Sequence, residues 1–284
     1  MVYRVMKKIQ ILNGFWIRII AIITMVIDHL AILLVNFDLM SLESNTYYFM
    51  RLLGRLSFPL FAFGIVEGVL HSKNIKKYLM RLGIMAVGIT LAIIIIEKAF
   101  GFILIFVDNI FLTLFLGALS ISLIKKKNWI SFFSIIPIGL SIFGNYYILA
   151  PYFVPQYGIY GVLMILFMYL GNIIAHIISK KQAAKANLNY SDYITTSYYQ
   201  QNVNLLYAAA IVIVNVIFYV LVKFIPSLNE TILMFIQDYS IISIIFMILY
   251  SGKRGYDSKW YRTFNYLFYP MHLVLLYVIL YLLF

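Results

Sequence analysis

The chain has 284 residues, of which 64% are hydrophobic and only 11% charged, and its mean hydropathy is +0.95. Soluble domains do not have this composition, so the chain is predicted to be one integral membrane domain over residues 1–284. It contains no cysteine, which excludes disulfides, thiolate metal sites and a cysteine nucleophile. The net charge of +12 is divided among short connections between apolar segments, so nucleic-acid binding is not expected.

Nine apolar segments follow one another, each with about the twenty residues that a membrane-spanning helix needs. Backbone groups in lipid must pair within the protein, so helices are predicted, and the ten-residue alternation of a barrel is not seen. The predicted fold is therefore all-α and polytopic, in the cytoplasmic membrane. The first segment is long and has no small-residue cleavage site, so no cleavable signal peptide is expected. The segments are 14–35, 47–70, 78–97, 102–124, 129–149, 157–178, 203–223, 231–250 and 263–283.

Basic residues predict the orientation of these segments. Seventeen of the 22 Lys and Arg residues lie at alternate connections, a pattern that nine spans satisfy without exception. The positive-inside rule then places the N-terminus in the cytoplasm and the C-terminus outside. The five basic groups precede segment one or follow segments two, four, six and eight; they are Arg4, Lys7 and Lys8; Lys73, Lys76, Lys77 and Arg81; Lys125, Lys126 and Lys127; Lys180, Lys181 and Lys185; and Lys253, Arg254, Lys259 and Arg262.

The long polar connection is 180–202, which this topology places in the cytoplasm. It is rich in tyrosine, and its composition suits either a linker or an interfacial helix. It carries no catalytic motif. No internal repeat is found along the chain, so the sequence does not indicate an inverted-repeat transporter.

The first segment carries ionisable residues at membrane depth, where such side chains are costly and indicate a functional site. Arg18 and His29 are eleven positions apart. Eleven residues make about 1100° of helical rotation, so the two side chains share one face, about 16 Å apart along the axis. Asp28 projects about 100° away from His29 and is expected to face a neighbouring helix.

Further polar residues are predicted at a similar depth in the outer half of the membrane. Arg51 and Arg55 are four apart on segment two and share a face. Asp108 and Asn109 interrupt segment four, for which a start near Ile110 is the alternative. The two remaining candidates are Tyr157, which opens segment six, and His272, at mid-membrane in segment nine.

Structural roles compete with functional ones for these residues. Both arginines could extend to the outer headgroups. Asp28 could neutralise one of them in a buried pair. His272 could hydrogen-bond a backbone carbonyl freed by Pro270. These alternatives stay open at the level of the sequence, and only His29 has no good structural explanation.

The order of several motifs resembles the TraX family. The resemblance runs from about residue 13 to 280 and is weakest over 180–202. The first-segment spacing Arg18-x10-His29 is also similar to a motif of membrane acyltransferase-3 proteins, which O-acetylate surface glycans. The motifs are NGF-x13-DH, RLLGRLSFPLFAFGIVEG, KNIKKYLMRL, DNIFLTLFLG, YGIYGVLMILF and YPMHLVLLY.

The resemblance implies an activity, because the TraX family is named for a conjugation protein that acetylates the N-terminus of pilin. The implied enzyme moves an acetyl group from cytoplasmic acetyl-CoA to a hydroxyl or amine outside, on a glycan or a pilin-like protein. His29 would be the general base. Other catalytic roles fall to Asp28, Arg51, Arg55 and Asn109, with an oxyanion held by either arginine or Asn109. The donor would bind Arg18, Lys76, Lys77 and Arg81, and Asp108, Tyr157 and His272 would contact substrate.

Several points stay open at this stage. An acyl-histidine intermediate is an alternative to direct transfer. A secondary transporter or flippase, with the buried charges as a polar path, is a second hypothesis. A non-catalytic membrane scaffold is a third. No metal is expected, membrane lipid and acyl-CoA are the expected partners, and the sequence does not predict the acceptor, the acyl length or the oligomeric state.

Overall fold

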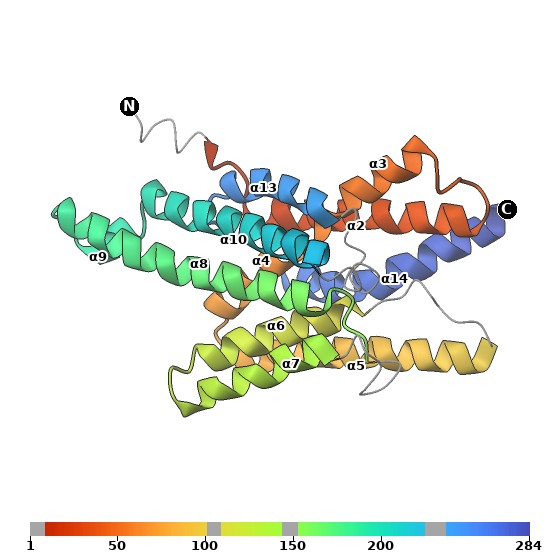
Figure 1. Ribbon diagram of the computed structural model, residues 1–284, viewed down its shortest axis with the longest axis horizontal. Helices are drawn as coiled ribbons and strands as arrows, with labels where there is room; N and C mark the ends of the chain where they lie inside the picture. The colour runs from red at the N-terminus through yellow and green to blue at the C-terminus, as the bar shows by residue number, and fades with distance from the viewer. Residues whose placement is uncertain (1–8, 101–108, 144–152, 225–236) are drawn as a thin grey trace. The chain divides into compact units, whose positions relative to one another are not determined.

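The computed structural model describes residues 9–100, 109–143, 153–224 and 237–284, and its extended elements of secondary structure in these ranges are all helices (Figure 1). Two isolated bridges are the only strand-like pairings in the described ranges. The all-α prediction is confirmed. The elements are α2 Gly14–Asn36, α3 Asn45–Gly54, α4 Ser57–His71, α5 Ile75–Phe100, α6 Ile110–Ile124, η1 Trp129–Ser134, α7 Ile135–Phe143, α8 Gly158–Lys185, α9 Tyr190–Tyr193, α10 Ser197–Phe224, η3 Asp238–Ser243, α13 Ile244–Ile248 and α14 Lys259–Leu283.

Six helices in the described ranges are long and apolar enough to cross a membrane. The described parts of three further predicted segments form shorter apolar helices, and the rest of these segments lies outside the described residues. The total of nine spans, the cytoplasmic N-terminus and the identity of the membrane stay predictions. The six long helices are Gly14–Asn36, Asn45–His71, Ile75–Ile95, Gly158–Lys185, Ser197–Phe224 and Lys259–Leu283, and the shorter ones are Ile110–Ile124, Trp129–Ile142 and Asp238–Ile248.

The second long helix is interrupted between α3 and α4, which the sequence analysis did not predict. Pro59 lies in the first turn of α4 and has no amide hydrogen to donate to Arg55. The Ser57 hydroxyl donates to the Gly54 carbonyl at 2.8 Å, which satisfies one of the acceptors at the end of α3. The interruption leaves Arg55 as the C-terminal cap of α3.

The chain forms two compact units. Unit 1 comprises residues 1–61, 167–219 and 234–284, and therefore holds α2, α3, α13, α14 and most of α8 and α10. Unit 2 comprises residues 62–166 and 220–233, and holds α5, α6, α7 and most of α4. The single integral domain over residues 1–284 stays a prediction.

The polar stretch 180–202 is largely helical. α8 continues to Lys185 and α10 begins at Ser197, with the short α9 between them. Polar side chains join the two long helices here: Gln182 Oε1 accepts from the Tyr193 hydroxyl at 2.8 Å and from Asn202 Nδ2 at 2.6 Å. The stretch therefore joins α8 and α10 as a helical hairpin, with the short α9 in the connection. Its cytoplasmic location stays a prediction.

Candidate active site

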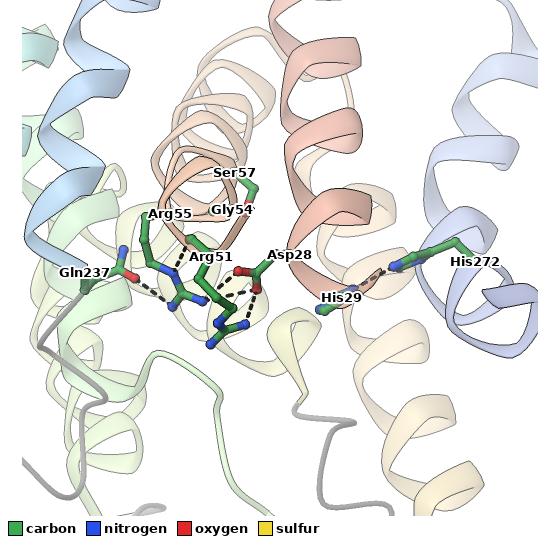
Figure 2. Close-up of polar contacts among 8 residues, drawn as sticks. All are labelled: Asp28, His29, Arg51, Gly54, Arg55, Ser57, Gln237 and His272. Carbon is green, nitrogen blue, oxygen red and sulfur yellow. Dashed lines mark hydrogen bonds and ion pairs between the residues drawn. The ribbon is translucent and has the colours of Figure 1, made fainter. Parts of the chain in front are cut away.

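Asp28 lies in unit 1 between two arginines, on one side of α2 (Figure 2). Arg51 Nη1 donates to Asp28 Oδ2 at 2.8 Å. Arg55 Nη2 donates to both carboxylate oxygens, at 2.9 and 3.1 Å. The side chains are only 12% exposed for Asp28, 12% for Arg51 and 7% for Arg55. The pairing role predicted for Asp28 is confirmed, and the alternative in which the arginines extend to the headgroups is wrong for this structure.

The cluster depends on a close approach of α2 and α3. A Cβ atom added at Gly54 would lie 2.1 Å from Asp28 Oδ1 and 2.3 Å from Asp28 Cβ, so only glycine fits there. Arg55 also donates through Nη1 to Gln237 Oε1 at 3.3 Å, which links α3 to the residue before η3. Buried ion pairs persist when further hydrogen bonds satisfy the charged groups, as they do here.

His29 lies on the other side of α2 and pairs with His272 of α14 (Figure 2). His29 Nδ1 and His272 Nε2 are 2.7 Å apart, and the rings are nearly parallel, with centroids 5.0 Å apart. Both residues are buried, and Tyr269 contacts both rings edge-on. The predicted divergence of Asp28 and His29 is confirmed, since each faces a different helix.

Hydrogen bonding assigns the protons of this pair. His272 Nδ1 lies 2.9 Å from the Phe268 carbonyl oxygen, which can only accept, so His272 Nδ1 carries a hydrogen. Among the described residues, no carboxylate lies within ion-pair distance of either ring, and burying an unpaired imidazolium is costly, so both rings are neutral. His272 Nε2 is then the acceptor for His29 Nδ1–H, and His29 Nε2 keeps a lone pair.

The pairing of His29 with His272 was missed by sequence reasoning, which assigned His272 to substrate contact or to the carbonyl freed by Pro270. Pro270 frees the carbonyl four residues earlier, at Tyr266, whereas His272 bonds Phe268. The positions of the two histidines along their helices could have indicated the pairing. His29 is fifteen residues after the start of α2 and His272 thirteen after the start of α14, so the two residues match in depth if both helices start on the same side.

Arg18 faces the same helix as His29. Its Cζ atom lies 5.5 Å from the centroid of the Tyr261 ring on α14, a cation–π contact. Arg18 and His29 therefore both meet α14, which confirms that their eleven-residue spacing places them on one face. The other predicted donor-binding residues, Lys76, Lys77 and Arg81, are exposed on the first two turns of α5 in unit 2. Their role in binding stays a prediction.

Asn109 belongs to unit 2 and has its amide fully engaged. Its Oδ1 accepts from the Leu112 amide at 3.0 Å and caps α6, and its Nδ2 donates to Ala86 O at 2.7 Å and to Thr90 Oγ1 at 2.9 Å. No amide hydrogen is left for an oxyanion, so the structure favours a capping role over the catalytic one. The Tyr157 backbone amide donates to Thr113 Oγ1 at 3.2 Å, and substrate contact by Tyr157 stays a prediction.

Two further predictions concern Asp108 and the absence of a metal ion. Asp108 lies outside the described residues. Among those described, no three His, Cys, Asp or Glu side chains gather closely enough to hold a metal ion. The described site therefore consists of two clusters in unit 1, the Asp28 ion pairs and the His29–His272 pair, on two sides of the same turn of α2.

Comparison with known proteins decides the family. The model of the family described as TraX protein matches residues 14–176, more than half of the chain. The chain belongs to the TraX family. The TraX match includes Asp28, His29 and both arginines, whereas His272 lies beyond it. The relation to acyltransferase-3 proteins stays a prediction.

One curated relative resembles part of this TraX-family chain. It is the probable fimbrial assembly protein FimC, serogroup H1, of Dichelobacter nodosus, with 44% identity over 70 residues. The match covers 25% of this chain and 27% of that protein, so it spans about a quarter of the relative's length. No solved structure matches the chain.

Proposed function

We propose that this TraX-family protein is a transmembrane acyltransferase. It moves an acetyl or similar acyl group from acyl-CoA, made in the cytoplasm, to a hydroxyl or amine on the other side of the membrane. The observation that carries the proposal is the buried pair of His29 Nδ1 and His272 Nε2, which lie 2.7 Å apart. The acceptor is a surface glycan or, in keeping with the fimbrial assembly name of the partial relative, a protein subunit of a surface fibre.

The hydrogen-bond chain from His29 through His272 to the Phe268 carbonyl gives His29 the form that a general base needs. Its Nε2 lone pair is held at a fixed ring orientation in a site shielded from water. In the proposed reaction, Nε2 takes the proton from the acceptor as the acceptor oxygen or nitrogen attacks the thioester carbonyl. The C–S bond then breaks, and the leaving thiolate receives that proton. A positioned base of this kind contributes about 10²- to 10⁴-fold in rate.

The ion-pair cluster supports this chemistry from the adjacent residue. Asp28 holds the guanidinium groups of Arg51 and Arg55 at the depth of His29. Guanidinium groups fixed in a site of low polarity stabilise the negative charge that develops on a thioester oxygen. We assign this role to the arginines and make Asp28 the residue that positions them. Attack by His29 Nε2 itself, with an acyl-histidine intermediate, is the variant that uses the same groups.

The test uses protein purified in lipid nanodiscs, with acetyl-CoA and no ion gradient. We expect slow release of free thiol, and we expect His29→Gln to lower its rate by about 10²-fold or more. His71→Gln is the matched control, because the His71 side chain is 74% exposed. Full activity in a folded His29→Gln variant would reject the proposal, and transport of a solute without thiol release would favour the transporter instead.

The acceptor is found by a second experiment. Mass spectrometry of the cell envelope, with the gene intact and with the gene carrying His29→Gln, is expected to reveal an acyl group that only the intact gene adds. Identical acyl content in the two envelopes would contradict the proposal.

A further inference from the structure

A basic loop precedes α14 and is fastened to the start of α2. The Gly14 amide donates to Lys253 O at 2.8 Å. The Ser251 amide donates to Leu12 O at 2.7 Å, and the Leu12 amide donates to Leu249 O at 2.9 Å. Gly252 and Gly255 have φ of +72° and +74°, and a Cβ at either would overlap a neighbouring side chain. The backbone of the loop is therefore held against the start of α2.

Positive charge is concentrated at this end of the two helices. Five cationic residues belong to the first turns of α2 and α14 and to the loop before α14, and Asp257 pairs with two of them: with Arg254 Nη2 at 2.6 Å and with Arg262 Nε at 3.1 Å. The Asp257 side chain is 10% exposed, but those of Arg254 and Arg262 are 68% and 41% exposed. One buried acid therefore holds two accessible guanidinium groups side by side. The five cations are Arg18, Lys253, Arg254, Lys259 and Arg262.

Two further observations indicate that this end binds a ligand. Arg18 has no carboxylate within ion-pair distance in the described part of the chain, although it lies within a membrane-spanning helix. Tyr261, against which Arg18 packs, is only 4% exposed, and its hydroxyl has no hydrogen-bond partner among the described residues. A buried hydroxyl without a partner is costly, and a bound polar group would remove that cost.

The distance from this end to the histidine pair is the same along both helices. Arg18 precedes His29 by eleven residues on α2, and Arg262 precedes His272 by ten on α14. At 1.5 Å per residue these separations are about 16 Å and about 15 Å. Arg18 and Arg262 thus lie at one end of α2 and α14, and the histidine pair lies further along the same two helices. The separation is close to the length of an extended linker of the pantetheine type.

We propose that Arg18, Arg254 and Arg262 bind the phosphate groups of the acyl donor, with Tyr261 as an additional hydrogen-bonding group. The donor is then a phosphate-bearing thioester whose acyl end extends along α2 and α14 to His29. Paired guanidinium groups suit phosphate because each offers two parallel N–H donors. This inference rests on the proposed acyltransferase function. It places the donor's anionic end on the loop before α14 and on the first turn of α14, whose basic residues the sequence alone indicated only as an orientation signal.

The experiment measures binding to protein in nanodiscs of neutral phosphatidylcholine. The ligands are coenzyme A, adenosine 3′,5′-bisphosphate and pantetheine, which lacks phosphate. We expect the double variant Arg254→Gln/Arg262→Gln, and separately Arg18→Gln, to weaken the first two ligands at least tenfold and to leave pantetheine unchanged. Lys180→Gln/Lys181→Gln, which removes the same charge from another exposed basic segment, is expected to bind all three as wild type does.

Each result has a definite consequence. Unchanged coenzyme A binding in both arginine variants would overturn the inference, even if thiol release continued to depend on His29. Loss of binding to anionic lipid vesicles, with coenzyme A binding unchanged, would assign the arginines to lipid headgroups and also overturn it. Arginine-dependent binding without any thiol release would support the phosphate site while rejecting the proposed acyltransferase. Arg18→Gln leaves the Asp257 ion pairs intact, so it tests the site even if the double variant folds poorly.

Discussion

Replacing Asp28 by alanine removes a carboxylate that pairs with both buried arginines. Two ion pairs depend on it, at 2.8 and 2.9 Å, and the arginine side chains left behind are 12% and 7% exposed. Breaking a buried ion pair by removing one partner costs about 3–5 kcal/mol, because the remaining charge stays buried. We expect a loss in the upper part of this range, which corresponds to a factor of about 10³ in the ratio of folded to unfolded protein.

The assay is unfolding by SDS from mild detergent micelles, followed by circular dichroism and by tryptophan fluorescence. Glu43→Ala is the matched control, since Glu43 is an exposed acid in the loop before α3 and its loss is expected to change the stability by less than about 0.5 kcal/mol. If Asp28→Ala and Glu43→Ala unfold at the same SDS mole fraction, the reasoning about the buried cluster is wrong.

The other predictions concern packing, proton position and the loop. Gly54→Ala is expected to disrupt the Asp28 cluster and to destabilise the protein in the same assay. Gly64→Ala is the control and should be neutral or slightly stabilising, because its added Cβ meets no described atom within 4 Å. Equal effects of the two substitutions would contradict the close approach of α2 and α3 at Gly54. His272→Phe is expected to lower the rate of thiol release by at least tenfold. His272→Gln should retain part of the activity, because its amide oxygen can accept a hydrogen bond from His29 Nδ1–H. Equal activity of the two variants would exclude a role for His272 in positioning His29. Asn204→Leu removes the hydrogen bonds to Ile248 O at 3.2 Å and to Tyr250 O at 2.7 Å. We expect the free energy of unfolding to fall by about 1–3 kcal/mol and hydrogen exchange at the Ser251 amide to become faster. Unchanged slow exchange at Ser251 would contradict this prediction.

Much of the fold and part of the site could be predicted from local patterns. Apolar runs give the positions of the long helices because lipid imposes their length and composition. Helical geometry explains why Asp28 and His29 diverge and why Arg18 and His29 share a face. Asn109 before an apolar run is also a recognisable N-terminal cap, and the structure favours that role over the catalytic one.

The remainder depends on contacts between segments that are distant in the sequence. His29 and His272 are 243 residues apart, and no periodicity links them. The double salt bridge of Asp28 requires the absence of a side chain at Gly54, which only the packing of α2 on α3 reveals. The interruption before α4 could have been found from Pro59, but apolar length alone concealed it.

The histidine pair joins the first long helix of the described chain to the last. During synthesis, α2 enters the membrane while more than two hundred residues are still untranslated, so His29 at first has no imidazole beside it. The pair can form only once α14 has been made and inserted. A chain that stops anywhere between the end of α2 and residue 272 would therefore keep His29 but lack the imidazole that pairs with it.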